Sequence, residues 1–375
     1  MKKSREYDLC YVTNDSISEG VGSSQIVPLV KGLSSLGLKV NLISLEKTLP
    51  DNALGNDLLQ AKVDWTPLPF GEFGMISGIG RIEKLRQAIP TTKLIHGRSD
   101  VPTVAAIFSG KAPVLWDVRS LWADQKFLVR EQLHQKLSYS AYRKLEDIAC
   151  SKSAGLSTLT SAVVSVLASR HKTLPIRRIV VPTAVDLEKF SLSRQIPRKL
   201  KVLFSGTYSQ YYDLELSARF IKEFKKKRML EVHWAKPAES VTLSLNVGEE
   251  KIFTVSQTIM PQIIHEYAFG LAVCKLNAGP SLSAAMPTKI AELLATGRPV
   301  VVNKGLGDMD ELLLNSGAGV VLDGSTSNLI ESVDRLIDLV ENPETPMKCR
   351  ELAESHFDLK VGIAKYNKLY NSLLQ

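Results

Sequence analysis

Short apolar segments alternate with longer amphipathic segments along the whole chain. Residues 26–36 are typical of the longer kind, because their apolar side chains recur at the spacing of one helix face. Strands that alternate with helices in this way form parallel sheets with helices on both faces. The pattern therefore predicts an α/β fold. The expected strands are residues 7–13, 39–45, 93–98, 113–119, 155–160, 178–185, 201–207, 230–236, 251–257, 270–276, 299–304 and 319–323.

A polar segment without apolar periodicity, residues 186–199, interrupts this alternation. On each side of it the chain begins with a strand, a glycine-containing loop and a helix, as a doubly wound domain does. We therefore expect two Rossmann-like parallel-sheet domains that face each other across a cleft, residues 1–186 and 187–356. The amphipathic tail, residues 357–375, is expected to form a helix that packs back on the first domain.

Net charge and hydropathy indicate which partners and which cellular location to expect for the protein. The net charge of +8 is spread over 375 residues, so it does not require nucleic acid, and we expect no nucleic-acid partner. No apolar run approaches the roughly 20 residues of a membrane span. The first residues contain no signal-peptide core. A cytoplasmic location is therefore expected.

The sequence gives little support for metal or redox chemistry. Cysteines at positions 10, 150, 274 and 349 form no pair with the spacing of a metal or redox site, which favours buried thiols. The acidic residues of 308–310 suit a helix start, where they stabilise the dipole, better than a metal site. We expect no metal and no cofactor.

A glycine-containing loop, residues 18–25, follows the first expected strand. Gly20 and Gly22 would let the backbone approach a ligand closely, but the third position of the dinucleotide fingerprint is Gln25. A nicotinamide site is therefore disfavoured. A loop that contacts a phosphate or a sugar and a plain tight turn both stay open.

Polar side chains gather where two later strands end. His96 and Arg98 close one strand and point to the same side of it, and Asp117 and Arg119 close the next. Hydrolysis of a glycosidic bond would need two converging carboxylic acids, and only Asp117 is an obvious candidate. A structural role for the histidine stays open.

The segment 285–302 predicts a helix that Pro287 opens and Gly297 ends, followed by a buried strand. Lys289 and Glu292 share one face of this helix near its amino terminus. An anion there would meet free backbone N–H groups and the lysine, and the glutamate can accept both hydroxyls of a ribose. An exposed ion pair is the alternative interpretation.

These motifs resemble those of the GT-B retaining glycosyltransferases, specifically family 4 of bacterial sugar transferases. "PTKIAELLATGRPVVV" resembles the second-domain signature, and "GVGSSQIVPLVKGLSSLGLKVNLISLE" resembles the first β-α-β unit. "HGRSD" and "WDVRSLWADQ" are similar to stretches of one subgroup, and "VVPTAVDLEKF" is similar to the element that leads into the second domain. The similarity spans nearly the whole chain.

The resemblance implies three groups of site residues. Glu292 corresponds to the glutamate that binds the nucleotide ribose, and Lys289 would help to hold the diphosphate. The full donor-nucleotide group is Gly20, Gly22, Gly206, Thr207, Pro287, Thr288, Lys289 and Glu292. The sugar-pocket group is Ser281, Ser283 and Ala284, and the catalytic group is His96, Arg98, Asp117 and Arg119.

This sequence also departs from the family. Ala284 stands where many members have a second glutamate, and the loop 205–213 lacks the usual arginine and lysine. Thr183 and Ala184 replace an Asn-Gly pair. Two alternatives therefore stay open: a non-catalytic GT-B-like subunit that binds a nucleotide, and a GT-B-fold nucleotide-sugar epimerase.

The resemblance implies a metal-independent transferase that moves a sugar, with retention of configuration, from a nucleoside-diphosphate donor to an acceptor hydroxyl. The expected acceptor is lipid-linked or an oligosaccharide, in the synthesis of cell-surface polysaccharide. A basic helix expected over residues 126–149 would allow peripheral contact with an anionic membrane at the inner face of the plasma membrane.

Overall fold

A computed structural model describes residues 6–48, 52–71, 75–128, 133–195, 197, 199–206, 209, 211–237, 244–256 and 258–375. The chain divides into two compact units. Unit 1 is Met1–Pro182 with Leu359–Gln375, and unit 2 is Thr183–Asp358. These divisions lie within a few residues of the expected domain limits, 186/187 and 356/357. The resemblance to GT-B transferases implies that the first domain lies on the acceptor side and that the second binds the nucleotide-sugar donor, and these roles stay predictions.

Unit 1 is built on one parallel sheet, whose described strands follow the order β3-β2-β1-β4-β5-β6-β7. Its strands are β1 (Tyr7–Val12), β2 (Val40–Glu46), β3 (Val63–Pro69), β4 (Thr92–Arg98), β5 (Val114–Val118), β6 (Gly155–Thr158) and β7 (Arg177–Val180). Its helices are η1 (Gly22–Ile26), α1 (Val27–Ser35), α2 (Asn52–Gln60), α3 (Met75–Ala88), α4 (Asp100–Ser109), α5 (Trp122–Lys126), α6 (Leu133–Lys152), α7 (Ser161–Arg170) and α14 (Leu359–Leu374).

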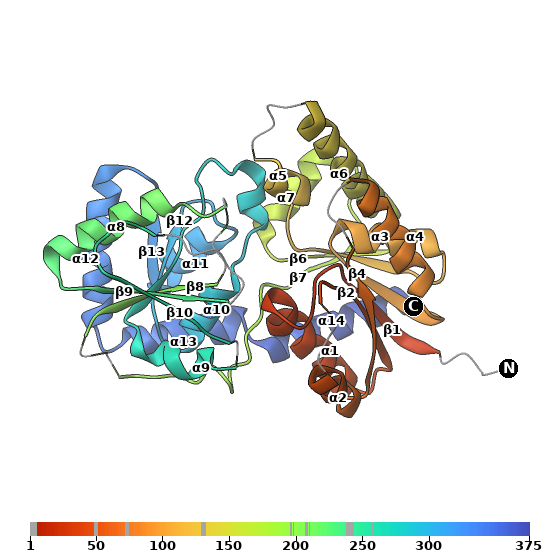
Figure 1. Ribbon diagram of the computed structural model, residues 1–375, viewed down its shortest axis with the longest axis horizontal. Helices are drawn as coiled ribbons and strands as arrows, with labels where there is room; N and C mark the ends of the chain where they lie inside the picture. The colour runs from red at the N-terminus through yellow and green to blue at the C-terminus, as the bar shows by residue number, and fades with distance from the viewer. Residues whose placement is uncertain are drawn as a thin grey trace. The chain divides into compact units, whose positions relative to one another are not determined.

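Alternate residues of β1 explain why both faces of this sheet are covered. Leu9 and Tyr11 pack into a core with α1 and α14, whereas Cys10 and Val12 pack into a second core with α3 and α4. Figure 1 shows helices on both sides of the strands. The tail helix α14 supplies Tyr366 to the first of these cores, so the last residues of the chain complete unit 1.

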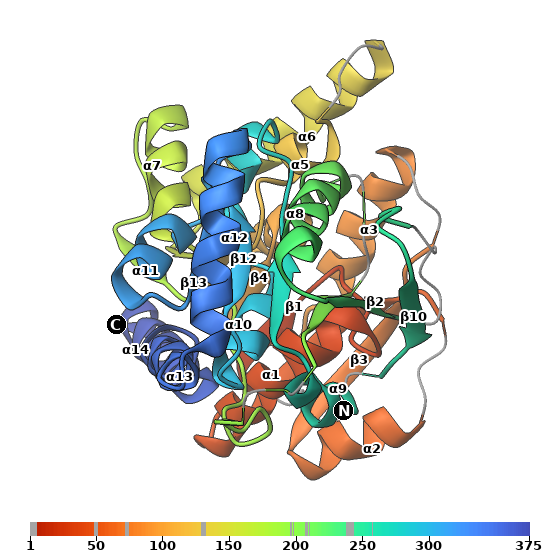
Figure 2. The same cartoon turned by 90° about the vertical axis from the view of Figure 1, so that its left-hand side faces the viewer.

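Unit 2 contains a second parallel sheet, in the order β10-β9-β8-β11-β12-β13 over its described strands. These are β8 (Lys201–Ser205), β9 (Glu231–Lys236), β10 (Glu250–Thr254), β11 (Phe269–Ala272), β12 (Val300–Asn303) and β13 (Gly319–Leu322). Its helices are α8 (Leu214–Lys227), α9 (Met260–Ile263), η2 (Ile264–Glu266), η3 (Gly279–Ala284), α10 (Thr288–Ala295), α11 (Met309–Ser316), α12 (Thr326–Glu341) and α13 (Thr345–His356). Figure 2 shows α8 and α12 side by side, and both supply residues to one buried core.

The predicted α/β fold with two doubly wound parallel sheets is confirmed, and the twelve expected strands are present with small shifts at their ends. Strand β3 was missed, because Pro67 and Pro69 and a mostly half-buried pattern disguise it. The helix expected over 126–149 is instead α5 and α6, and residues 129–132 between them lie outside the described residues. Leu137 of α6 is 59% exposed.

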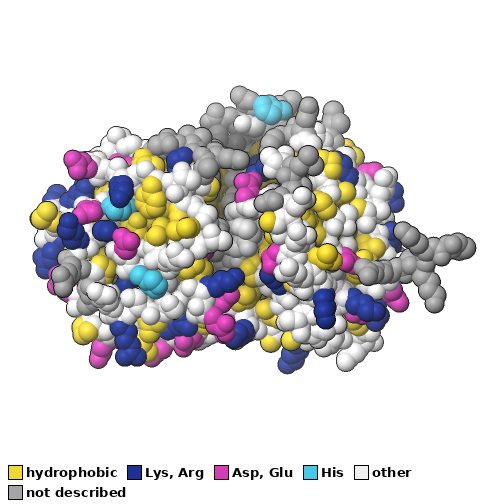
Figure 3. Space-filling view, turned by 60° about the horizontal axis from the view of Figure 1, so that its bottom comes forward, with side chains coloured by type: hydrophobic (Ala, Val, Ile, Leu, Met, Phe, Trp, Pro, Cys, Tyr) yellow, Lys and Arg dark blue, Asp and Glu magenta, His cyan; other side chains and the backbone are white. Residues whose placement is uncertain are grey.

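Surface charge agrees with the even spread expected from the sequence. On the face in Figure 3, Lys and Arg side chains are interspersed with Asp and Glu side chains over both units. Within the described residues, no helix is both long and apolar enough to cross a bilayer.

Candidate functional site

Each sheet has a switch point, the position from which strand order proceeds in opposite directions. In unit 1 it lies between β1 and β4, and in unit 2 between β8 and β11. Parallel sheets of this kind bind ligands beyond the carboxyl ends of the strands at such a point. Arg98, at the end of β4, donates from Nε to Asp15 Oδ2, after β1, across 3.0 Å. In unit 2, Tyr212 and Cys274 form a backbone bridge across the corresponding position.

The two glycines of the loop after β1 have different structural roles. Gly20 has φ +51° and open space around the position of a Cβ atom. A Cβ on Gly22 would lie 1.9 Å from the carbonyl oxygen of Ser16, so the fold itself requires glycine there. The predicted donor contacts of both glycines stay predictions.

Glu46, at the end of β2, bears on the dinucleotide hypothesis. An acidic residue at this place binds the ribose in dinucleotide-binding sheets. Here its carboxylate is buried and accepts hydrogen bonds from Ser16 Oγ and Ser44 Oγ, both at 2.5 Å, and from the backbone of Ile17 at 3.1 Å. The carboxylate holds the loop in place and is already occupied, which argues further against a nicotinamide site.

The four residues of the predicted catalytic group lie together at the carboxyl ends of β4 and β5. Arg119 Nε donates to Asp117 Oδ2 at 2.6 Å, and Ser157 Oγ donates to Asp117 Oδ1 at 2.7 Å. His96 Nε2 lies 3.0 Å from Asp117 Oδ2, without the alignment of a good hydrogen bond. Asp117 is therefore the centre of a buried polar network.

Two tyrosines of α14 complete this network, and the sequence analysis missed both. Tyr370 Oη lies 2.7 Å from His96 Nδ1, and Arg119 Nη2 donates to Tyr366 Oη at 2.8 Å. Tyr366 Oη lies 3.2 Å from Asp117 Oδ1 and donates to it. Tyrosines four residues apart on an amphipathic helix share one face, and this spacing was the available signal.

The pKa shifts of Asp117 and His96 indicate which groups of the network are charged. Burial alone would raise the pKa of Asp117, but the charge of Arg119 and the contact with His96 outweigh it and hold that pKa below its usual range. Burial lowers the pKa of His96, although Asp117 opposes this. The network therefore contains an ionised Asp117 and a neutral His96.

The residues of the predicted catalytic group differ in how much of their side chains is exposed to solvent. His96 and Asp117 are both 0% exposed, so neither contacts a ligand in this conformation. The Arg119 side chain is 11% exposed and that of Asp15 is 41% exposed. A buried, saturated carboxylate suits a positioning role, whereas the groups that reach solvent are the ones that can meet a ligand.

In unit 2, the amino-terminal turn of α10 places Lys289 and Glu292 at 7% and 6% exposure. The alternative of an exposed ion pair is therefore wrong. The Lys289 ammonium lies 4.5 Å from the centroid of the Tyr212 ring, a cation–π contact. Burial lowers the pKa of Lys289 to about 8 and raises that of Glu292 to about 7. Both shifts reflect charged groups that have lost hydration, which a ligand of complementary chemistry would replace.

The start of α10 is held in place by the segment that enters unit 2. Pro287 is the N-cap residue, and it and Thr288 are partly exposed. Thr183 Oγ1 donates to the carbonyl oxygen of Met286 at 2.6 Å. This bond gives Thr183 a structural role, because its hydroxyl anchors the loop before α10.

The predicted sugar-pocket residues lie on η3, directly before α10. Ser281 is buried, and its Oγ donates to Ala278 O at 2.7 Å and to Tyr211 Oη at 3.4 Å. Ala284 is 1% exposed, whereas Ser283 is partly exposed. Gly206 begins the loop after β8 with φ +91°, and Thr207 lies outside the described residues. Of the three pocket residues, only Ser283 offers appreciable surface to a ligand.

The described residues contain no group of three or more His, Cys, Asp or Glu side chains placed to hold a metal ion. All four cysteines are free and buried, as expected from their spacing. That the protein needs no metal stays a prediction.

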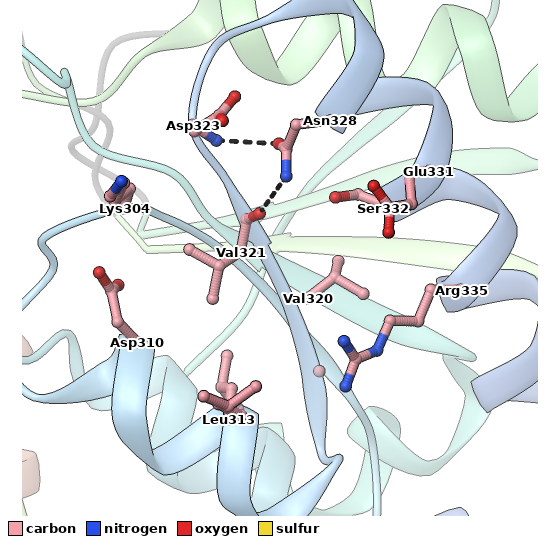
Figure 4. A pocket seen from close by; sticks show the side chains of 12 residues that line it. Lys304, Asp310, Leu313, Val320, Val321, Asp323, Asn328, Glu331, Ser332 and Arg335 are labelled. Carbon is pink, nitrogen blue, oxygen red and sulfur yellow. Dashed lines mark hydrogen bonds between the residues drawn. The ribbon is translucent and has the colours of Figure 1, made fainter.

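A pocket of about 290 Å³ lies elsewhere in unit 2, beside the edge strand β13 and between α11 and α12 (Figure 4). Asn328 spans part of this edge: its Nδ2 donates to Val321 O at 3.2 Å and its Oδ1 accepts from Asp323 N at 2.9 Å. The side-chain amide thus satisfies backbone groups that a further strand would otherwise pair. This pocket is separate from the switch point.

No protein-family model matches the chain, and no curated protein matches it in sequence. Solved structures do match in fold. Sucrose-phosphate synthase from Thermosynechococcus elongatus has a TM-score of 0.74 at 12% identity, over 97% of this chain and 98% of that one. The fold is GT-B.

Two further solved structures match the chain in fold. Anabaena HepE in complex with UDP-glucose has a TM-score of 0.66 at 14% identity, over 97% of this chain and 98% of that one. WaaG, a glycosyltransferase involved in lipopolysaccharide biosynthesis, has a TM-score of 0.66 at 13% identity, over 96% and 98%. At such identities the likeness establishes the fold alone.

Proposed function

We propose that this protein is a glycosyltransferase that takes a sugar from a nucleoside-diphosphate donor. The observation that carries the proposal is the buried Lys289–Glu292 pair on the first turns of α10, beside the switch point of unit 2. A diphosphate would place negative charge beside the buried lysine, and ribose hydroxyls would solvate the carboxylate. Solved structures of the same fold include one with UDP-glucose, which agrees with this proposal.

The chemistry asks chiefly for stabilisation of the departing diphosphate. Lys289 and the backbone N–H groups at the start of α10 would supply it, since such fixed donors act where charge develops. The departing phosphate can itself accept the proton of the acceptor hydroxyl, so no strong general base is needed. Attack on the face that the phosphate leaves would retain the anomeric configuration, and no metal is required.

In unit 1, we assign a contact role to Arg119 and a positioning role to His96 and Asp117, whereas Arg98 is buried beside Asp15 and Asp117. The two buried residues fix the arginine at the end of β5 through Asp117 Oδ2. The acceptor is proposed to be lipid-linked or an oligosaccharide in polysaccharide synthesis, with the protein at the inner face of the plasma membrane. The exposed basic residues of α6, Lys136 and Lys144, would support contact with anionic lipid.

A non-catalytic nucleotide-binding subunit is the second candidate. Ala284 favours it, because this buried residue carries no carboxylate to bind the donor sugar. Product analysis with and without acceptor distinguishes the possibilities: a transferase gives a glycosylated acceptor, an epimerase gives an isomerised nucleotide sugar without acceptor, and a subunit gives neither.

The first test is thermal unfolding of the wild type with UDP, GDP, dTDP and ADP. A ligand at 100 times its Kd stabilises the folded state by about 2.7 kcal/mol. We expect one nucleotide to raise the Tm of the wild type and of Glu311→Ala, an exposed glutamate of the same unit, but not of Glu292→Ala. No shift with any nucleotide, or an equal shift in Glu292→Ala, would overturn the proposal.

A further inference from the structure

The outer edge of β13 carries backbone groups that have no partner strand. Lys304 N donates to Leu322 O at 2.8 Å, so alternate residues of β13 turn their backbone groups towards β12. The backbone groups of Gly319 and Val321 face the other way, into the pocket in Figure 4. Because β13 is the last strand in the described order of its sheet, no described strand pairs with them.

The side chain of Asn328 takes the place of one residue of a further strand. Its Nδ2 donates to Val321 O and its Oδ1 accepts from Asp323 N, which are the two bonds that one residue of a parallel strand makes. One step along the edge, Gly319 O and Val321 N–H form an equivalent pair. Neither has a hydrogen-bond partner among the described residues. The edge is therefore covered at one position and open at the next.

The helices beside this open position lie on opposite faces of the sheet. Val320 and Leu322 pack into the core that contains α8 and α12, so their side chains point to the face that α12 covers. Alternate side chains of a strand point to opposite faces, so Val321 points to the face on which α11 packs. The β13 groove, as we call the pocket between the two helices, therefore has an α12 wall and an α11 wall.

The α12 wall presents polar groups that have no partner in the described part of the chain. Ser332 is 5% exposed, and its Oγ makes no hydrogen bond with a described residue. Arg335 is exposed and forms no ion pair, whereas the adjacent Asp334 pairs with Lys227 at 2.6 Å. In Figure 4 both Ser332 and Arg335 point towards β13. A hydroxyl and a guanidinium are thus available to an occupant of the groove.

Two of the acidic residues of the groove already bind backbone groups. Asp310 accepts from Gly305 N with both oxygens, at 3.1 and 3.0 Å. Asp323 Oδ1 accepts from Ser325 N at 2.8 Å. Glu331 is exposed and makes no ion pair with Arg335. The guanidinium on the α12 wall therefore lacks an acidic partner, which an occupant can supply.

The α11 wall is apolar where it meets the edge. Leu313 is buried, and Leu314 beside it is 72% exposed. A strand added to β13 would turn alternate side chains towards this wall and towards the α12 wall. The groove therefore suits a chain in which apolar and acidic residues alternate.

We propose that the β13 groove binds an extended segment of another protein, in which acidic residues face Ser332 and Arg335 and apolar residues face Leu314. Unpaired backbone groups beside a recess are the features that strand addition uses. A volume of about 290 Å³ accommodates only a short part of such a segment. A second copy of this chain fits poorly, because its own β13 is recessed between the same two helices.

The first experiment measures binding of a fluorescein-labelled peptide, Glu-Val-Glu-Val-Glu with blocked ends, by fluorescence anisotropy. We expect the wild type to bind it with a Kd between about 1 μM and 1 mM. Arg335→Glu should weaken binding at least about tenfold, because it removes a charge-assisted contact. Lys222→Glu, the same change of charge at an exposed position of α8, should bind like the wild type.

Two further peptides test the chemistry of the groove. The same peptide with N-methylated valines lacks two of its backbone donors and should not bind. Lys-Val-Lys-Val-Lys should bind the wild type weakly and gain affinity for Arg335→Glu. No binding of the acidic peptide at about 1 mM, or equal losses in Arg335→Glu and Lys222→Glu, would overturn the proposal.

Hydrogen exchange of the full chain locates the bound peptide. The N–H groups of Gly319 and Val321 have no partner, so they should exchange rapidly in the free protein and slowly with the acidic peptide bound. The opposite edge strand, β10, should exchange at the same rate in both samples. Protection of β10, or no protection of β13 when the peptide is bound, would overturn the proposal.

Light scattering tests whether a second copy occupies the groove instead. We expect the wild type and Arg335→Glu to have the same molar mass. A wild-type dimer that Arg335→Glu dissociates would assign the groove to a second copy and overturn the proposal. None of these experiments uses a nucleotide, so their failure would leave the proposed sugar transfer unaffected.

Discussion

The switch points of the two units bury charge in opposite ways. In unit 1, Asp117 is surrounded by donors from β5, β6 and α14, and its pKa is held low. In unit 2, Lys289 and Glu292 are buried on one helix turn, and their pKa values move towards each other, to about 8 and about 7. In unit 1 the Asp117 carboxylate receives hydrogen bonds from several elements of the protein, whereas in unit 2 the proposed ligand would add contacts to the buried pair.

Under the proposed function, this difference distinguishes a structural network from a binding site. A buried charge with full partners stabilises one arrangement and is costly to disrupt. A buried charge whose pKa has moved towards neutrality has not recovered its hydration, and such groups are common at functional sites. In the proposed function, unit 1 presents a rigid surface and unit 2 holds the charged ligand. The predictions below test this contrast, from the largest effect to the smallest.

Asp117→Ala should give the largest loss of stability. It leaves Arg119 and Arg98 buried without their shared carboxylate, which costs about 3–5 kcal/mol. Urea unfolding measures this loss. Asp15→Ala removes a carboxylate that is 41% exposed and should cost only about 0–1 kcal/mol. Equal losses of stability in Asp117→Ala and Asp15→Ala would mean that the buried network around Asp117 does not stabilise unit 1.

Glu292→Gln, in contrast to Asp117→Ala, should stabilise the ligand-free protein above pH 7. Burial raises the pKa of Glu292 in the folded state from 4.5 to about 7, so the folded state binds this proton more tightly than the unfolded state does. The free energy of unfolding therefore falls as the pH rises from about 4.5 to about 7. Glutamine removes this fall, worth about 1–3 kcal/mol at pH 8. Thermal unfolding at pH 5 and pH 8 gives the comparison, and a variant less stable at pH 8 would contradict it. The rise in Tm that a nucleotide gives the wild type should be absent from Glu292→Gln.

Nucleotide affinity should depend on pH with a maximum between about 7 and 8. Binding needs an ionised Glu292, which is lost as pH falls through about 7, and a protonated Lys289, which is lost as pH rises through about 8. On each side the affinity should fall by up to about tenfold per pH unit. Isothermal titration calorimetry from pH 5.5 to 9.5 tests this, and a flat profile would argue against the pair as the nucleotide site.

The smallest expected effect is at Tyr212, whose ring lies under the Lys289 ammonium. Tyr212→Leu removes the cation–π contact, worth about 1 kcal/mol, and should weaken nucleotide binding at pH 8 by about 2–5-fold. Tyr212→Phe keeps the ring and should bind like the wild type. If both variants bind equally weakly, the hydroxyl rather than the ring is important.

Sequence reasoning found the α10 helix and its charged pair because their signals are local. Pro287, Gly297 and the three-residue spacing of Lys289 and Glu292 all belong to one helix, and the structure places each of them at or beside its ends and first turns. It missed that both charged groups are buried, because burial depends on residues such as Tyr212 that are distant in sequence.

The unit 1 network also depends on contacts between residues that are distant in sequence, and to a greater extent. His96, Arg98, Asp117 and Arg119 were expected near one another from strand ends alone, and they are. Their partners Tyr366 and Tyr370 come from the other end of the chain, 274 residues from His96 in the case of Tyr370. No local pattern specifies such a pairing.

The sequence by itself determined the α/β alternation, the two parallel sheets and the turn chemistry around α10, because periodicity and chain reversal depend on neighbouring residues. Only the tertiary structure decided which charges are balanced and that Gly22 is required by Ser16. Those properties follow from contacts between segments, whose desolvation and close packing set pKa values and exclude side chains.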